Sequence, residues 1–148
     1  MRNKLLPPTY LNTILVLAIV LHFILPIKRI IHPPYTYAGP IIILFGVALN
    51  VWSARLLKNK SATIDFYETP TRLVMDGPFR ISRNPLYLGG VILSLGIAVL
   101  LGSLITFVFP TALLLILDKL YIPVEEKRLE KTFGKEYLEY KQRVKRWI

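Results

Sequence analysis

The feature that most constrains this chain is the run from Leu86 to Leu117, where 32 successive residues include no Asp, Glu, Lys or Arg. As one straight helix, the run would reach about 48 Å at ~1.5 Å per residue, whereas the hydrocarbon core of a bilayer is roughly 30 Å thick. The run must therefore fold back, and Gly102-Ser103 is the natural turn. We expect two helices, near 85–101 and 104–121, that form a short and closely paired hairpin.

Two earlier blocks, Tyr10–Ile27 and Pro33–Ser53, also lack formal charge, and each is long enough for one membrane helix. We expect these helices near 9–27 and 40–57. The first block could instead be a signal peptide. It lacks a small-residue cleavage site and runs into Pro26-Ile27-Lys28-Arg29, which favours a retained helix.

The expected fold is therefore an all-α integral membrane protein with about four transmembrane helices, the last two a hairpin, and a C-terminal amphipathic interfacial helix. Hydrophobic residues make up 53% of the 148 positions, and the mean hydropathy is +0.48, which is high for a soluble protein. We expect a single domain, 1–148, in which 1–72 supplies generic helices and 73–148 carries the polar motifs.

The placement of charge predicts the orientation. If the N-terminus lies inside, 17 of the 19 Lys and Arg residues and all nine carboxylates fall on the cytoplasmic side. We therefore predict a multi-pass protein of the cell (inner) membrane with both termini in the cytoplasm. The net charge of +10 then reflects topology and contact with anionic headgroups, and no nucleic acid is expected as a partner. The absence of cysteine and the wide separation of His22 and His32 argue against a metal site.

A polar, proline-containing stretch, DGPFRISRNPLYLGG (76–90), precedes the long uncharged run. Asn84 is a good N-cap and Pro85 suits the first helical position, so a helix should begin sharply here. Such a helix end attracts anions, and Arg83 adds a positive charge. The simpler interpretation is a plain helix start with an interfacial Tyr87 and an arginine that extends to the membrane surface.

Small residues recur every fourth position after this start, at Gly90, Ser94, Ala98 and Gly102. Close helix packing is the simplest explanation of such a stripe. Gly89 and Gly90 lie in the first turns, however, where missing side chains could also leave room for a ligand. On the preceding helix, Asn50 is expected to form a hydrogen bond between helices.

A second polar cluster follows the hairpin. Pro123 should kink or restart the helix, which places Glu125 and Glu126 in a first turn. One apolar stripe then continues to the C-terminus, with a break or bend expected at Gly134; its members are Leu129, Phe133, Tyr137, Tyr140, Val144 and Trp147.

A hairpin would bring residues 83–87 and 125–126 together at its mouth, the end opposite the turn. S-adenosylmethionine would suit that arrangement, because a helix end with Arg83 matches its carboxylate and glutamates match its ammonium or hydroxyl groups. Tyr87 could donate a hydrogen bond or lie beside the sulfonium. This chemistry alone leaves the ligand open.

At these residues the chain resembles the isoprenylcysteine carboxyl methyltransferase and phospholipid methyltransferase group. GPFRISRNPLYLGG and the later EEKRLEKTFGKEYLEYKQRVKRWI are similar to the two motifs of that group, in the same order around a hairpin. The resemblance covers roughly residues 73–148. It implies an integral membrane enzyme that transfers a methyl group from S-adenosylmethionine to a lipophilic acceptor, with S-adenosylhomocysteine as product.

The resemblance also implies site residues. The first cofactor motif is Arg83, Asn84, Pro85, Tyr87 and Gly89, and Leu88 lies within it. Glu125 and Glu126 form the acidic pair, with a catalytic role if the acceptor needs a base or orientation. Tyr137, with Phe133, Gly134 and Tyr140, belongs to the tail that covers the site.

The sequence departs from the group in two places. Asn84 stands where the eukaryotic carboxyl methyltransferases have His, and Lys119 and Tyr121 lie where those enzymes carry an Arg before the acidic pair. Methylation of a phospholipid or another amine is therefore an alternative to carboxyl methylation. A small transporter, a non-catalytic membrane scaffold and a membrane reductase that uses a nicotinamide cofactor are rival interpretations from different functional classes.

Overall fold

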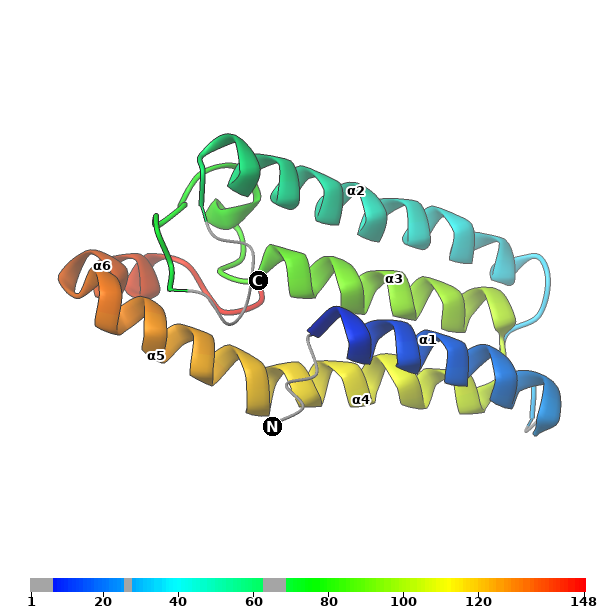
Figure 1. Ribbon diagram of the computed structural model, residues 1–148. Coiled ribbons are helices and arrows are strands. Elements are labelled where there is room, and N and C mark those ends of the chain that lie inside the picture. Colours follow the sequence, from blue (N-terminus) through cyan, green and yellow to red (C-terminus); the bar gives the residue numbers. More distant parts are fainter. Residues whose placement is uncertain (1–6, 26–27, 63–68) are drawn as a thin grey trace.

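A computed structural model describes residues 7–25, 28–62 and 69–148. Six α-helices follow one another along the described chain (Figure 1): α1 Pro7–Ile24, α2 Ala38–Asn59, α3 Pro85–Leu101, α4 Val108–Ile116, α5 Ile122–Phe133 and α6 Lys135–Arg143. A 3₁₀ turn, Leu104–Phe107, leads into α4, and a π-helical turn, Leu117–Tyr121, joins α4 to α5. The expected all-helical architecture is confirmed for the described residues.

Two helical stretches within the described residues are long and apolar enough to cross a membrane. These are Tyr35–Asn59 and Leu104–Phe133, whereas Asn12–Ile24 and Pro85–Leu101 are shorter apolar helices. The second long stretch continues well past residue 121, where the sequence predicted the last membrane helix to end. The count of four spans stays a prediction, and the expected end of the first helix at residues 26–27 lies outside the described residues.

Helices α2 and α3 lie side by side (Figure 1). Glycines of each helix face the backbone of the other. A Cβ atom on Gly46 would come within 2.7 Å of the Leu93 backbone nitrogen, and one on Gly96 within 2.7 Å of the Ile43 backbone nitrogen. Only glycine allows backbones to approach this closely. The small-residue contact with α2 therefore involves Gly89 and Gly96. The predicted stripe of Gly90, Ser94, Ala98 and Gly102 is buried as well.

The hairpin turn lies where the sequence placed it. Gly102 ends α3 with φ of +68°, a left-handed conformation that favours glycine. Its carbonyl accepts hydrogen bonds from the backbone N–H groups of Ile30 and Ile31, at 2.8 and 3.1 Å. The segment after α1 is thereby hydrogen-bonded to the turn between α3 and α4.

The C-terminal tail differs from the expected interfacial helix. The break at Gly134 is confirmed, with φ of +51°, but α6 ends at Arg143, so Val144 and Trp147 do not continue a helical stripe. The last residues turn back toward the start of α3 (Figure 1), where the N–H of Arg83 donates to the Lys145 carbonyl at 3.0 Å.

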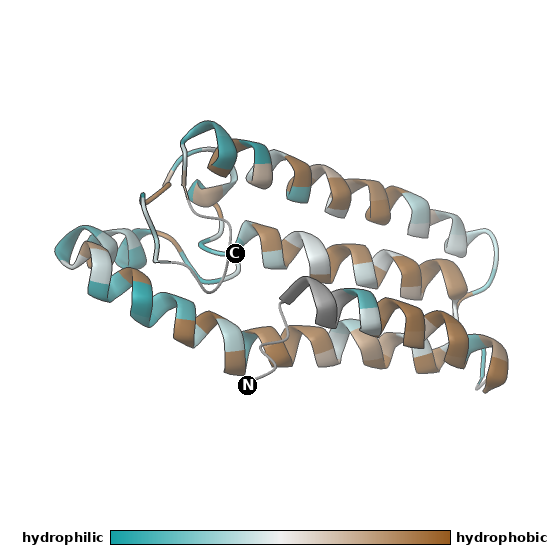
Figure 2. Cartoon of the chain, in the orientation of Figure 1, coloured by the Kyte–Doolittle hydropathy of each residue, from teal (hydrophilic) through white to brown (hydrophobic). Residues whose placement is uncertain are grey.

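The two tail tyrosines are also buried inside the protein rather than facing a membrane surface. Tyr137 is 1% exposed and Tyr140 is 4% exposed. The Tyr140 hydroxyl donates to the Phe79 carbonyl at 2.6 Å, so α6 packs on the loop that precedes α3. Hydrophilic residues gather at this end of the molecule, whereas α1 to α4 are mainly apolar (Figure 2).

Candidate active site

The start of α3 carries the first group of predicted site residues. Pro85 is the first residue of the helix, as expected, and Asn84 occupies the N-cap position. The Asn84 side chain makes no capping bond, however, because its Nδ2 donates to the Arg146 carbonyl at 3.0 Å. Asn84 therefore ties the C-terminal segment to α3, a role that its capping preference did not predict.

A buried ion pair joins the two motifs across the hairpin. The Arg83 Nη2 atom lies 3.1 Å from Glu126 Oε1, and the two side chains are only 8% and 7% exposed. Arg83 Nη1 also donates to the Tyr137 hydroxyl at 3.4 Å, and its Nε is buried with no partner among the described residues. The structure thus brings together three residues that are 11 or more positions apart in sequence, Arg83, Glu126 and Tyr137.

Both tail tyrosines are neutral over the ordinary pH range. Burial raises the pKa of Tyr137 to about 12, and the charge of Glu126 acts in the same direction. Burial likewise raises the pKa of Tyr140. At neutral pH the Tyr137 hydroxyl is therefore a hydrogen-bonding group beside Arg83 and not an acid.

The second glutamate has a different partner. Tyr87, in the first turn of α3, donates its hydroxyl hydrogen to Glu125 Oε2 at 2.8 Å. Tyr87 also packs against an apolar cluster that includes Leu117 and Ile122. One glutamate therefore lies in an ionic network and the other beside an apolar wall, although the two are adjacent in sequence.

Two predicted residues of the first motif serve the helix itself. The N–H of Leu88 donates to the Asn84 carbonyl at 2.9 Å, as in an ordinary first turn. Gly89 faces α2, where a Cβ atom would come within 2.2 Å of Asn50 Oδ1. The space beside Gly89 therefore accommodates Asn50 rather than a ligand. Asn50 Oδ1 is buried without a partner among the described residues, so it does not accept the expected interhelical bond.

Sequence reasoning missed three residues that complete the site. Arg146 contacts Glu126 Oε2 at 2.9 Å through Nη2 and Asp118 Oδ1 at 3.1 Å through Nη1. Trp147 Nε1 donates to the same Asp118 oxygen at 3.1 Å. The result is an alternating chain of charges, Asp118–Arg146–Glu126–Arg83, at the mouth between α3 and α5.

Asp118 did carry a signal in the sequence. It is the first charged residue after the long uncharged run, and an acid in that position needs a cationic partner. The partner lies 28 residues later and reaches Asp118 only because the tail folds back, which helical periodicity does not predict. Asp118 also lies in the π-helical turn, a local distortion common at functional sites.

Comparisons with known proteins agree with the family resemblance of the sequence. The family model "Phospholipid methyltransferase" matches residues 35–136. A "Probable protein-S-isoprenylcysteine O-methyltransferase" of Oryza sativa subsp. japonica is 37% identical over 78 residues, which are 53% of this chain and 41% of the rice protein. "Protein-S-isoprenylcysteine O-methyltransferase B" of Arabidopsis thaliana is 37% identical over 73 residues, 49% of this chain and 37% of that protein.

A bacterial relative matches over its whole length. An uncharacterized protein of Haemophilus influenzae is 33% identical over 63 residues, which are 43% of this chain and 100% of the relative. The chain spans about two fifths of the length of the plant relatives. No solved structure matches.

The described residues form a helical protein with long apolar helices and a buried polar site where α3 and α5 meet. Because the family model matches more than half of its length, the chain belongs to the phospholipid methyltransferase family.

Proposed function

We propose that this protein is an integral membrane methyltransferase that transfers a methyl group from S-adenosylmethionine to a lipophilic acceptor. Family membership and the names of the plant relatives support the reaction class. The observation that carries the proposal is the Arg83–Glu126 pair, at 3.1 Å, because it joins both motif halves in one buried polar site.

The residues at this mouth suit the cofactor. Arg83 retains a buried Nε donor with no partner among the described residues, which matches the carboxylate of S-adenosylmethionine. The Glu126 carboxylate is an acceptor that matches the ammonium or the ribose hydroxyls, and Tyr137 lies beside both Arg83 and Glu126. We assign cofactor binding to these residues together with Asn84, Pro85, Tyr87 and Glu125, whereas Leu88 and Gly89 serve the helix and its contact with α2.

When bound, S-adenosylmethionine supplies an electrophilic methyl group, whose bond to sulfur breaks as the bond to the acceptor forms. The protein must hold the reacting groups about 3–3.5 Å apart in line and keep water away. The ion pairs of Arg83 and Arg146 with Glu126 fix the carboxylate, and the folded-back tail covers it.

Two acceptor classes remain within the proposal. A carboxylate acceptor, as the names of the plant relatives indicate for those proteins, needs no general base. An amine or hydroxyl must lose a proton, and Glu125 is suited to accept it because Tyr87 orients its carboxylate at 2.8 Å. The family name and this geometry favour the amine as the second candidate.

Calorimetric titration of the purified protein in detergent with S-adenosylhomocysteine tests the proposal. We expect binding by the wild type, and weakening by tenfold or more, about 1.4 kcal/mol, in Arg83→Ala and Glu126→Ala. Removing one partner of a buried pair also destabilises the fold, by about 3–5 kcal/mol. Glu126→Gln and Arg83→Lys, with unfolding measured alongside, separate lost binding from lost structure.

Lys141→Ala is a matched control, because it removes a half-exposed pair with Glu130 at 3.7 Å. Such pairs contribute only about 0–1 kcal/mol, so neither binding nor stability should change appreciably. A folded wild type that does not bind would refute the methyltransferase and favour a scaffold. If the wild type does bind, transfer of a tritiated methyl group into a lipid extract would identify the acceptor class.

A further inference from the structure

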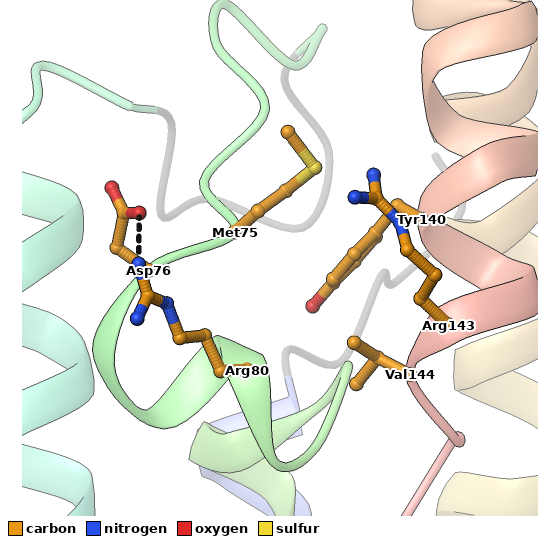
Figure 3. A pocket seen from close by; sticks show the side chains of 6 residues that line it. All are labelled: Met75, Asp76, Arg80, Tyr140, Arg143 and Val144. Carbon is orange, nitrogen blue, oxygen red and sulfur yellow. Dashed lines mark ion pairs between the residues drawn. The ribbon is translucent and has the colours of Figure 1, made fainter.

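A separate pocket lies between the segment 75–80 and the C-terminal end of the tail helix α6. It has a volume of about 470 Å³ and is lined by Met75, Asp76, Arg80, Tyr140, Arg143 and Val144. Figure 3 shows the segment 75–80 on one side and the end of α6 on the other, with Tyr140 between them. The pocket does not include Arg83, Glu125 or Glu126.

The charges around this pocket favour an anion. Asp76 is the one acid among the described lining residues, and it is paired with Lys60 at the end of α2. Lys60 lowers the pKa of Asp76, first through the hydrogen bond and then through its charge, so the pair is ionised and neutral in sum. Arg143 and Arg80, which lies 3.8 Å from Asp76, then give the described lining a net positive charge.

Contacts with the described residues do not saturate either guanidinium. Arg80 lies 3.8 Å from Asp76, at the outer limit of an ion pair, and its side chain is 75% exposed. Arg143 uses its Nε on the Glu139 carbonyl at 3.3 Å. Because a guanidinium carries five N–H donors, both residues keep donors in the paired geometry that suits phosphate.

The position of the pocket indicates the source of the anion. Its lining residue Asp76 is paired with Lys60 at the end of α2. This end of α2 is hydrophilic, whereas the body of α1 to α4 is mainly apolar (Figure 2). If α2 crosses the bilayer, this end lies at headgroup level, where anionic lipids concentrate. Met75 and Val144 add apolar lining beside the cations.

We infer that this pocket binds the phosphate of an anionic phospholipid headgroup between Arg80 and Arg143. This site is distinct from the methyl-transfer site; it rests on the proposed membrane insertion of α2 and not on methyl transfer. A bound lipid would link the 75–80 segment to α6, the two elements that Tyr140 already connects through the Phe79 carbonyl.

The test is calorimetric titration of the detergent-purified full chain with short-chain dihexanoyl phosphatidic acid. We expect binding, and a loss of about tenfold or more in affinity in the double variant Arg80→Gln/Arg143→Gln. The control is Lys131→Gln/Lys135→Gln, which removes the same charge from exposed positions of the tail and should bind as the wild type does. Titration with inorganic phosphate, in a second arm, distinguishes a lipid from a free anion.

Absence of lipid binding, or equal loss in both double variants, would overturn the inference. Arginine-dependent binding of inorganic phosphate as tight as that of the lipid would overturn the lipid source. S-adenosylhomocysteine is titrated into the same samples, and Arg80→Gln/Arg143→Gln should leave its affinity unchanged. Loss of both ligands in that variant would overturn the separation of the two sites.

Discussion

The contact between α2 and α3 and the polar mouth between α3 and α5 are built on opposite principles. In the first, glycines let two backbones approach until an added Cβ at Gly46 would lie 2.7 Å from a backbone nitrogen. In the second, charged side chains span the gap, with Glu126 held between Arg83 and Arg146. The first region tolerates no added volume, and the second tolerates no lost charge.

This difference follows from the surroundings of each region. In an apolar medium, association of helices gains little from the hydrophobic effect and depends on close packing. At the mouth, buried charges are costly unless each one is paired, so the alternating order of acids and bases is itself the stabilising feature. Substitutions of opposite kinds should therefore damage the two regions.

Among variants that leave the Arg83–Glu126 pair intact, the largest effect should come from added bulk in the glycine contact. Gly46→Leu would force the α3 backbone away, since the nearest atoms are the Leu93 nitrogen and the Gly89 carbonyl oxygen. Overpacking of this kind costs about 3 kcal/mol in the free energy of unfolding. Chemical unfolding in detergent, followed by circular dichroism, measures the loss.

Ala48→Leu is the matched control on the same helix. Ala48 is exposed, so the same side chain should change the stability little when it points away from α3. Equal losses in the two variants would mean that α2 is sensitive to bulk in general and not at the glycine contact.

A smaller effect should follow from a lost charge at the mouth. Arg146→Ala removes the bonds to Glu126 and Asp118, and hydrogen bonds between charged groups contribute about 1.5–3 kcal/mol. We expect a loss of about 2 kcal/mol, since Arg146 is partly exposed and Glu126 keeps Arg83. Chemical unfolding in detergent again measures the loss.

Lys145→Ala, on the same segment, is the control for Arg146→Ala. Its side chain is exposed, and the backbone bond from Arg83 to the Lys145 carbonyl remains. An Arg146→Ala protein as stable as this control would show that the tail is not held by its charges.

The two regions also differed in how well the sequence predicted them. The uncharged runs, Pro85 and Gly102 predicted the start of α3 and the hairpin turn, because these depend on local composition and backbone preference. The contact between Arg83 and Glu126 could be predicted once the two helices were assumed to form a hairpin. The family resemblance was confirmed by the match to residues 35–136.

Long-range side-chain contacts were the part that the sequence did not predict. Periodicity placed Val144 and Trp147 on a helix, but α6 ends at Arg143, and Arg146 beyond it contacts Asp118 and Glu126. The regular spacing of Gly90 and Ser94 likewise concealed Gly89 and Gly96, seven positions apart, as the residues that face α2. A pattern along one helix does not specify which neighbour it faces.

The smallest effect is one of pH, and it also separates the two regions. The pKa of Tyr137 is raised from 10.0 to about 12, first by burial, so an unfolded chain loses this proton at a lower pH than the folded protein does. Tyr137 therefore contributes stability that is full below pH 10 and is lost as the pH rises toward 12. In Tyr137→Phe this part of the alkaline loss should disappear, with little cost at neutral pH because the bond from Arg83 is long, at 3.4 Å.

Unfolding measured at several alkaline pH values tests this expectation, with Gly46→Leu expected to lose stability as steeply as the wild type. The glycine contact has no proton to release, so a variant that weakens only that contact shifts the curve without changing its slope.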